Sequence, residues 1–218
     1  MSSNQPAVLH YFKGRGRAET VRLMLAACGI EFSHGPFMTG PEVIDKLRDE
    51  GLLMFNQVPL LQIDGLNLVQ SMACVRYLAR KYNLAGSAPA DIARIEMISE
   101  GARDCLSPLL DKKFMPDDQY QQKAQSTADR YLPVFETELQ SDYFVGQSLT
   151  QADVCVFEVL LLIEEECPEA FVECPKLKAY LTRMKQEKNF ADYLASDKRL
   201  PPNDDQYVKE VRHTLRWN

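Results

Sequence analysis

The hydrophobic pattern of this 218-residue chain changes at about residue 90, and that change limits the possible folds more than any other feature. Before it, short runs with the two-residue period of strands alternate with stretches of helical period. After it, apolar residues recur only every three to four positions. Because alternating strands and helices build α/β layers, whereas consecutive helices pack on one another, the pattern predicts an α/β domain followed by an all-α domain.

The first domain, residues 1–83, is predicted to contain a small mixed sheet of four strands. A strand and a helix within 8–28 form a βα unit, which needs a parallel partner strand. The pair Asp64-Gly65 lies between two apolar runs and is typical of a tight antiparallel hairpin. We expect strands at 8–12, 31–34, 60–63 and 66–70, helices at 21–28 and 41–50, and a closing helix through Cys74, Leu78 and Tyr82.

Residues 84–90 contain Gly, Ser and Pro and are predicted to link the first domain to a helical domain at 91–218. Thr150 and Asp153 have the spacing of a capping box before an apolar run. In the tail, Val208, Val211 and Leu215 share one helix face, so the tail could form a lid or a helix packed on its own domain. Helices are expected near 91–114, 119–141, 150–166, 175–186, 189–195 and 205–216.

Composition narrows the class of protein further. The net charge of −6 argues against nucleic acid as the main partner, because a phosphate backbone requires a basic surface. The longest purely apolar run, residues 159–163, is too short to cross a bilayer, and the first residues lack the pattern of a signal peptide. Six cysteines without a C-x-x-C pair or a histidine cluster offer no metal site. We therefore expect a globular protein of the reducing cytoplasm, without membrane association.

Tyr11 lies at the carboxyl end of the first predicted strand, at the edge where open α/β sheets bind ligands. A phenol there can donate a hydrogen bond to a thiol, and a hydrogen bond to the ionised form lowers the pKa of that thiol. Arg15, Arg17 and the N-terminus of the following helix would act in the same direction. The residues alone also allow an ordinary strand-end tyrosine with a solvated hydroxyl.

Three further features are predicted to lie at the same edge. Pro59 restricts Val58 to an extended backbone, so Val58 could pair with an extended peptide ligand. Ser71 is expected to be the N-cap of the closing helix, and the helix N-terminus after Gln70 could bind a carboxylate. Arg48 could bind a second carboxylate. Each feature alone also fits an ordinary structural role: a turn proline, a helix cap and a solvated arginine.

Several segments closely resemble the cytosolic glutathione S-transferases: LHYFKGRGRAE, KLRDEGLLMFNQVPLLQIDG, LVQSMA and RYLARKYNLAG. LLMFNQVP resembles the alpha class most, and RGRAET is similar to the sigma class. GQSLTQAD, residues 146–153, resembles the capping motif of the family's second domain, so the resemblance covers the whole chain. It implies a thioredoxin-like first domain, a homodimer, and glutathione as co-substrate with no cofactor.

The resemblance also assigns roles to individual residues. It implies that Tyr11 hydrogen-bonds the glutathione sulfur and that Arg17 adds positive charge beside it. The peptide bond before Pro59 is expected to be cis. The implied glutathione-binding residues are Tyr11, Arg48, Gln57, Val58, Pro59, Gln70, Ser71, Asp104 and Arg130, of which Asp104 and Arg130 would reach the tripeptide bound to the other subunit.

The implied pocket for small hydrophobic electrophiles lies between the domains. Phe55 corresponds to the aromatic key that inserts into the other subunit of the dimer. Asp111 departs from the family's pattern, because it puts a carboxylate near a normally apolar wall. The implied pocket residues are Phe12, Gly16, Leu110, Val211 and Leu215.

Several activities remain open. The leading one is transfer of the glutathione thiolate to hydrophobic electrophiles, an EC 2.5.1.18 type of reaction, with peroxidase activity toward organic hydroperoxides as an addition. The alternatives are a glutathione-dependent lipid or steroid isomerase, and a noncatalytic ligandin or crystallin-like protein on the same fold. A thiol–disulfide enzyme is set aside because no cysteine precedes Cys28.

Overall fold

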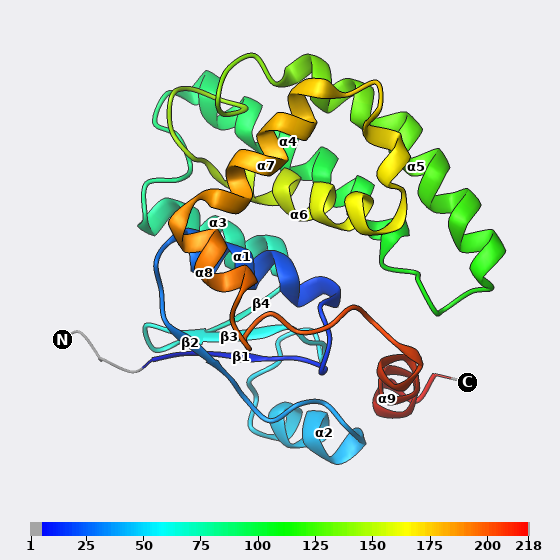
Figure 1. The fold of residues 1–218 in the computed structure, drawn as a ribbon. Helices are drawn as coiled ribbons and strands as arrows, with labels where there is room; N and C mark the ends of the chain where they lie inside the picture. Colours follow the sequence, from blue (N-terminus) through cyan, green and yellow to red (C-terminus); the bar gives the residue numbers. More distant parts are fainter. Residues whose placement is uncertain (1–5, 218) are drawn as a thin grey trace.

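A mixed sheet and a bundle of helices form two parts of the computed structural model, which describes residues 6–217 (Figure 1). Residues 1–5 of the predicted first domain and residue 218 of the second lie outside this range. The sheet lies in the lower half of the view and the bundle in the upper half. The predicted fold class, an α/β domain followed by an all-helical one, is confirmed.

The sheet has the strand order β2-β1-β3-β4 and consists of β1 (Ala7–His10), β2 (Phe32–His34), β3 (Leu60–Ile63) and β4 (Leu66–Val69). β1 and β2 are parallel, and the other neighbours are antiparallel, as predicted. Asp64 and Gly65 join β3 to β4 with φ angles of 55° and 77°, which fit the two left-handed positions of a type I′ turn. β1 ends at His10, so Tyr11 begins the loop that follows.

Helices cover both faces of the sheet (Figure 1): α1 (Glu19–Ala27) and α3 (Ser71–Lys81) lie on the side of the bundle, and α2 (Pro41–Asp49) lies on the other. The predicted apolar face of α1 is buried, with Val21 and Met24 at 0% exposure. This packing joins the sheet to the bundle through one shared apolar core.

The bundle surrounds a central buried helix, α6 (Gln151–Glu166), which contacts α1 as well as its own neighbours. The predicted capping box is confirmed, because the Thr150 backbone N–H donates to Asp153 Oδ2 at 2.8 Å. Around α6 lie α4 (Pro89–Leu109), α5 (Asp117–Glu138) and α7 (Pro175–Gln186), and α8 (Lys188–Leu194) packs against α1 and α7.

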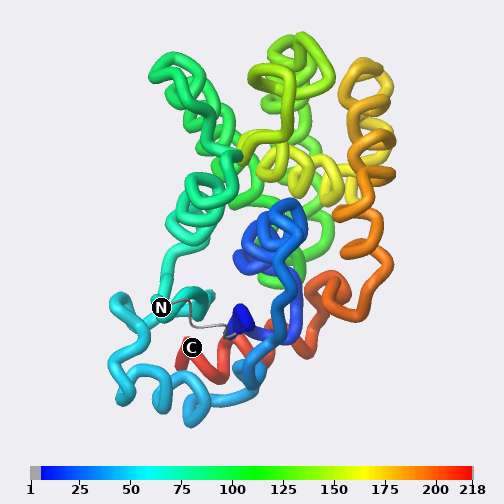
Figure 2. Tube along the Cα trace, turned by 90° about the vertical axis from the view of Figure 1, so that its left-hand side faces the viewer, coloured from blue at the N-terminus to red at the C-terminus, as the bar shows by residue number. Residues whose placement is uncertain are grey.

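The last helix, α9 (Asp205–Leu215), leaves the bundle and packs against α2 of the sheet domain (Figures 1 and 2). The Thr214 hydroxyl donates to the Met38 carbonyl oxygen at 3.4 Å, and Arg216 Nη2 pairs with Asp45 Oδ2 at 2.5 Å. Although α9 falls within the range predicted for the helical domain, its described contacts therefore tie it to the first part of the chain.

Several predicted helix ends were wrong, including that of α5, which ends at Glu138 rather than near residue 141. Tyr82 does not belong to the buried face of α3, since it follows the helix with non-helical angles and is 37% exposed. α4 ends at Leu109 rather than near residue 114, because the residues that follow form turns, with the Asp111 N–H donating to the Pro108 carbonyl oxygen at 3.3 Å and the Phe114 N–H to the Asp111 carbonyl oxygen at 2.9 Å.

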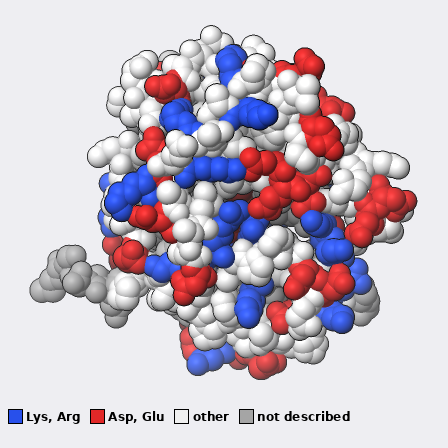
Figure 3. Space-filling model, in the orientation of Figure 1, with Lys and Arg blue, Asp and Glu red and all other residues white. Residues whose placement is uncertain are grey.

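Lys and Arg alternate with Asp and Glu over the face of the molecule in Figure 3. No continuous basic surface of the kind that nucleic acid requires covers that face. Within residues 6–217, every helix is too short or too polar to cross a bilayer.

Candidate functional site

Tyr11 follows β1 directly and lies at the carboxyl end of that strand, as predicted. Its side chain is 6% exposed, and its hydroxyl oxygen accepts a hydrogen bond from the backbone N–H of Arg17 at 3.0 Å. Arg17 belongs to a single 3-10 turn, Gly16–Ala18, which brings that N–H back over the phenol. Since the amide donates to the oxygen, the phenolic proton remains available for another acceptor.

A cleft of about 220 Å³ opens beside Tyr11. It brings together residues that the sequence assigned to both the glutathione site and the acceptor pocket. These are Tyr11, Phe12, Gly16, Arg17, Gln57, Val58, Leu110, Val211 and Leu215. The cleft therefore combines a phenol, an exposed guanidinium and the residues before the cis proline with a set of apolar side chains.

Gln70 and Ser71 line a neighbouring cavity of about 100 Å³, which shares Arg17 with the cleft. The prediction that Ser71 caps α3 was wrong: Gln70 is the N-cap, and Ser71 is the first helical residue. The Ser71 hydroxyl instead donates to the Arg17 carbonyl oxygen at 2.6 Å. This bond ties the N-terminus of α3 to the turn that carries Arg17.

Arg48 does not line either cavity. Its guanidinium donates to the Asn56 carbonyl oxygen, at 2.9 Å from Nη2, and to Asp45 Oδ1 at 2.8 Å. In the chain as described, Arg48 supports the loop that leads to Gln57. The peptide bond between Val58 and Pro59 is cis, as expected.

Asp104, Arg130 and Phe55 lie away from the cleft and line neither of these cavities. The Asp104 side chain is 63% exposed, and the Arg130 guanidinium lies 5.1 Å from the centre of the Tyr131 ring. Phe55 is 57% exposed. These are the three residues for which the resemblance implies contacts across a dimer.

Four residues of the cleft were not among the predicted site residues: Phe114, Asn203, Tyr207 and Trp217. Tyr207 had a visible signal, because it lies four residues before Val211 and eight before Leu215, on the helix face assigned to the pocket. Phe114 and Asn203 lie in irregular segments, where no periodicity marks the inward side. Asp111 also lines the cleft, and its carboxylate pairs with Lys123 Nζ at 2.5 Å.

Comparison with known proteins decides the family. The model described as glutathione S-transferase, N-terminal domain, matches residues 7–80, and the one described as glutathione S-transferase, C-terminal domain, matches residues 103–197. This chain belongs to the glutathione S-transferase family. It is 39% identical over 217 residues to glutathione S-transferase A1 of Bos taurus, covering 96% of this chain and 97% of that one.

Other relatives support the assignment of this glutathione S-transferase to the alpha-class group. It is 38% identical over 218 residues to glutathione S-transferase alpha-2 of Rattus norvegicus, covering 96% of this chain and 98% of that one. The crystal structure of the glutathione S-transferase from Ascaris lumbricoides superposes with a TM-score of 0.76 at 29% identity, covering 92% of this chain and all of that one. The alpha-class resemblance inferred from LLMFNQVP is thereby confirmed.

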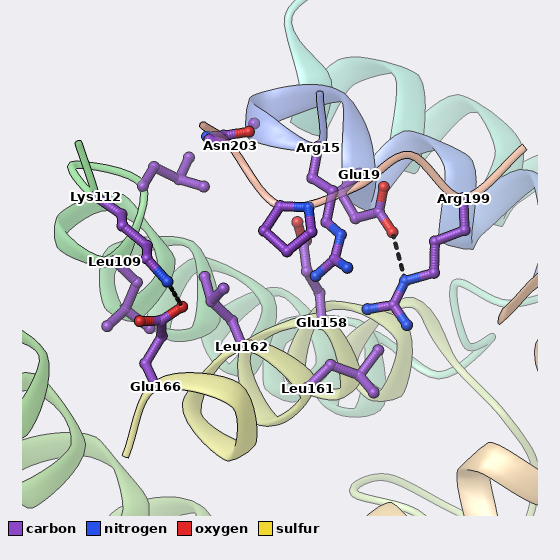
Figure 4. Close-up of a pocket in the computed structure, with 13 residues that line it drawn as sticks. Arg15, Glu19, Leu109, Lys112, Glu158, Leu161, Leu162, Glu166, Arg199 and Asn203 are labelled. Atoms are coloured by element: carbon purple, nitrogen blue, oxygen red, sulfur yellow. Dashed lines mark hydrogen bonds and ion pairs between the residues drawn. The ribbon is translucent and has the colours of Figure 1, made fainter. Parts of the chain in front are cut away.

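A second group of charged side chains in this transferase comes from both domains and lines a separate cavity, which shares Gly16 with the cleft (Figure 4). Glu158, from α6, points toward Arg15 and Glu19 of the first domain, and Arg199 Nε lies 3.7 Å from Glu19 Oε1. Burial raises the pKa of Glu158 to about 8, and the Thr20 hydroxyl donates to its carboxyl at 2.5 Å. The enclosed space is only about 40 Å³, so these groups serve mainly to join the two domains.

Glu158→Gln should flatten the dependence of stability on pH. The carboxyl has a pKa of about 8 when folded and an ordinary value near 4.5 when unfolded, so its stabilising contribution is complete below about pH 4.5 and is lost as the pH rises toward 8. One such group gives a slope of at most ~1.4 kcal/mol per pH unit. Urea unfolding across this window should show a steeper decline for the native protein than for the variant. Equal slopes would mean that Glu158 is ionised in the folded protein.

Proposed function

We propose that this protein is a cytoplasmic glutathione S-transferase that ionises the thiol of bound glutathione and transfers the sulfur to small hydrophobic electrophiles. The observation that carries the proposal is the Tyr11 hydroxyl, which accepts the Arg17 N–H and keeps its own proton available in a cleft lined by both polar and apolar groups. The names of the relatives, glutathione S-transferases of cattle and rat, support the same activity.

The proposed mechanism begins with the tripeptide at the polar end of the cleft. The Val58 backbone pairs with its cysteinyl residue, and Gln70 and Ser71 hold its γ-glutamyl carboxylate at the N-terminus of α3. Gln57 and Pro59 shape the wall beside it. Arg48 binds the glycyl carboxylate of the tripeptide. To do so, the Arg48 guanidinium gives up its hydrogen bond to the Asn56 carbonyl oxygen.

The chemical step needs no covalent bond to the protein. The glutathione thiol releases its proton to solvent, and the Tyr11 hydroxyl donates a hydrogen bond to the resulting thiolate. The Arg17 charge also favours that anion. A lone pair of the sulfur then forms a bond to the electrophilic carbon, and the leaving group departs with its bonding electrons. Holding both reactants in one cleft supplies the gain from proximity.

The proposal is tested by the conjugation of glutathione to a chlorodinitrobenzene, followed by the absorbance of the product. We expect turnover that saturates in both substrates. Tight glutathione binding without conjugation of this or other electrophiles would favour a noncatalytic ligandin or crystallin-like role. Reduction of an organic hydroperoxide, or isomerisation of a lipid or steroid ketone, at a higher rate than conjugation would make that reaction the main activity.

We also propose that the protein is a homodimer in which Phe55 is the aromatic key, with Asp104 and Arg130 near the glutathione of the other subunit. Support comes from the exposed apolar pair of Met54, at 78% exposure, and Phe55, at 57%. Burial of this pair against a second subunit would remove both apolar side chains from water.

Phe55→Ser should therefore weaken dimerisation. Full burial of a phenylalanine contributes about 1.5–3 kcal/mol, and a symmetric dimer loses two such contacts, so the dimer dissociation constant should rise at least about 100-fold. Sedimentation equilibrium measures this constant. Val172→Ser is the matched control, because Val172 is also an apolar side chain with 75% exposure but lies on the helical domain. An unchanged constant for Phe55→Ser would remove Phe55 from the interface.

A further inference from the structure

The Tyr207 side chain of α9 reaches across the cleft to the Tyr11 phenol. The two hydroxyl oxygens lie 3.3 Å apart, and both side chains are buried, at 6% and 5% exposure. Within residues 6–217, Tyr11 is the partner that the structure gives to the Tyr207 hydroxyl. The proposed mechanism uses only the first of these two phenols.

The loop after β1 leaves just enough room for Tyr207. A Cβ atom at Gly14 would lie 2.5 Å from the Tyr207 ring, and one at Gly16 would lie 2.4 Å from the Tyr207 oxygen and 2.6 Å from the Tyr11 oxygen. The ring also packs edge-on against Phe12, with centroids 5.9 Å apart. The Tyr207 backbone N–H donates to the capping carboxylate of Asp204 at 2.8 Å. Both ends of the residue are thus held in place.

The direction of the hydrogen bond follows from a count of protons. A phenol has one proton to donate and two acceptor positions on its oxygen. In Tyr11, one acceptor position takes the Arg17 N–H. When the Tyr11 proton points to a sulfur, the second acceptor position remains, and only Tyr207 can then be the donor between the two phenols. Burial raises the pKa of Tyr207 well above its ordinary value, so it keeps the proton that this role needs.

We propose that Tyr207 is a positioning residue that donates a hydrogen bond to the Tyr11 oxygen and thereby makes Tyr11 a stronger donor to the glutathione thiolate. This inference rests on the proposed function. Hydrogen bonds in a chain polarise one another, so a phenol that accepts a second bond donates more strongly. Because 3.3 Å is longer than the usual 2.7–2.8 Å for this type of bond, the effect on the thiol should be modest.

Other charges near the two phenols act on the same thiol. Arg17 and Arg22 favour the thiolate, whereas the Asp111 carboxylate opposes it and is itself paired with Lys123. Tyr207→Phe leaves all four side chains in place and keeps the ring that fills the cleft. A comparison of the variant with the native protein therefore isolates the Tyr207 hydroxyl.

The test is the pKa of the bound glutathione thiol, read from the ultraviolet absorbance of its thiolate in protein with and without saturating glutathione. Tyr207→Phe should raise this pKa by roughly half a unit to one unit, and so lower kcat/KM about 3- to 10-fold at pH values below it. Above it, kcat/KM should approach the native value. Tyr120→Phe is the matched control. It removes the hydroxyl of another buried tyrosine, which donates to the Leu109 carbonyl oxygen and not to Tyr11. It should leave the thiol pKa unchanged.

Two outcomes would overturn the proposal. One is an unchanged or lowered thiol pKa in Tyr207→Phe while the native protein lowers that pKa relative to free glutathione. The other comes from the double variant with Tyr11→Phe: a thiol pKa above that of Tyr11→Phe alone would mean that Tyr207 acts on the sulfur directly. A native protein that leaves the thiol at its free pKa would instead contradict the proposed function itself.

Discussion

Tyr11→Phe should lower the rate of glutathione conjugation at neutral pH by about 10- to 100-fold, because each unit by which the thiol pKa rises removes tenfold of the thiolate. The substitution deletes the Tyr11 hydroxyl, whose oxygen accepts the Arg17 N–H, while it keeps the buried ring. Much of the activity should return at alkaline pH, where the thiol ionises without help. The measurement is kcat/KM as a function of pH.

Glutathione affinity provides the control for this variant. The contacts proposed for Val58, Gln70 and Ser71 do not involve the phenol, so calorimetric titration should give nearly the native dissociation constant. Equal activity of the two proteins at neutral pH would remove Tyr11 from the mechanism. A lost affinity would mean that the phenol holds the tripeptide rather than activating it.

Arg22→Met should lower the free energy of unfolding by about 3–5 kcal/mol, a large part of the 5–15 kcal/mol of a typical domain. Arg22 is fully buried, and its guanidinium donates to Glu19 Oε2 at 3.1 Å and to His34 Nε2 at 3.1 Å. Burial, with the Arg22 charge, lowers the pKa of His34 to about 4, so the neutral imidazole can accept that bond. Methionine fills the space but leaves the Glu19 carboxylate buried without its main cation.

Urea unfolding measures this loss of stability. A control variant and a double variant show whether the loss comes from the buried charge pair. Lys188→Ala breaks an exposed pair with Asp192 and should leave the free energy of unfolding almost unchanged. The double variant with Glu19→Gln should recover part of the loss, because the uncompensated charge is gone. If Arg22→Met proved as stable as the native protein, the buried Arg22–Glu19 pair would contribute nothing to the stability of the fold.

The parts of the fold that the sequence predicted best are those with local signals. The Asp64-Gly65 turn sets its hairpin register, and the Thr150 capping box marks the start of α6 within one residue. The end of α4 was harder to predict, since Pro108 is tolerated in the last turn and the residues after it are tied by turns rather than by helical bonds. Local sequence patterns therefore predict the start of a helix or a hairpin turn better than they predict the end of a helix.

The cleft could be predicted only in part. Tyr11 was found because its place after a strand has a general meaning in α/β sheets. Tyr207 was missed because the contact joins residues 196 positions apart, and nothing local says that α9 packs on the first domain instead of its own. The partners of Arg48, the Asn56 carbonyl oxygen and Asp45, were not predicted either, because the bond to Asn56 depends on the conformation of a loop.

The position of α9 has a consequence for how the protein is made. Synthesis proceeds from the N-terminus, so the sheet and α2 leave the ribosome long before the residues that cover the cleft. Until residues 205–217 emerge, the Met38 carbonyl oxygen and the Tyr11 hydroxyl lack their partners on α9. Trp217 lines the cleft, so a tag or fusion appended after residue 218 would be joined directly to the cleft wall.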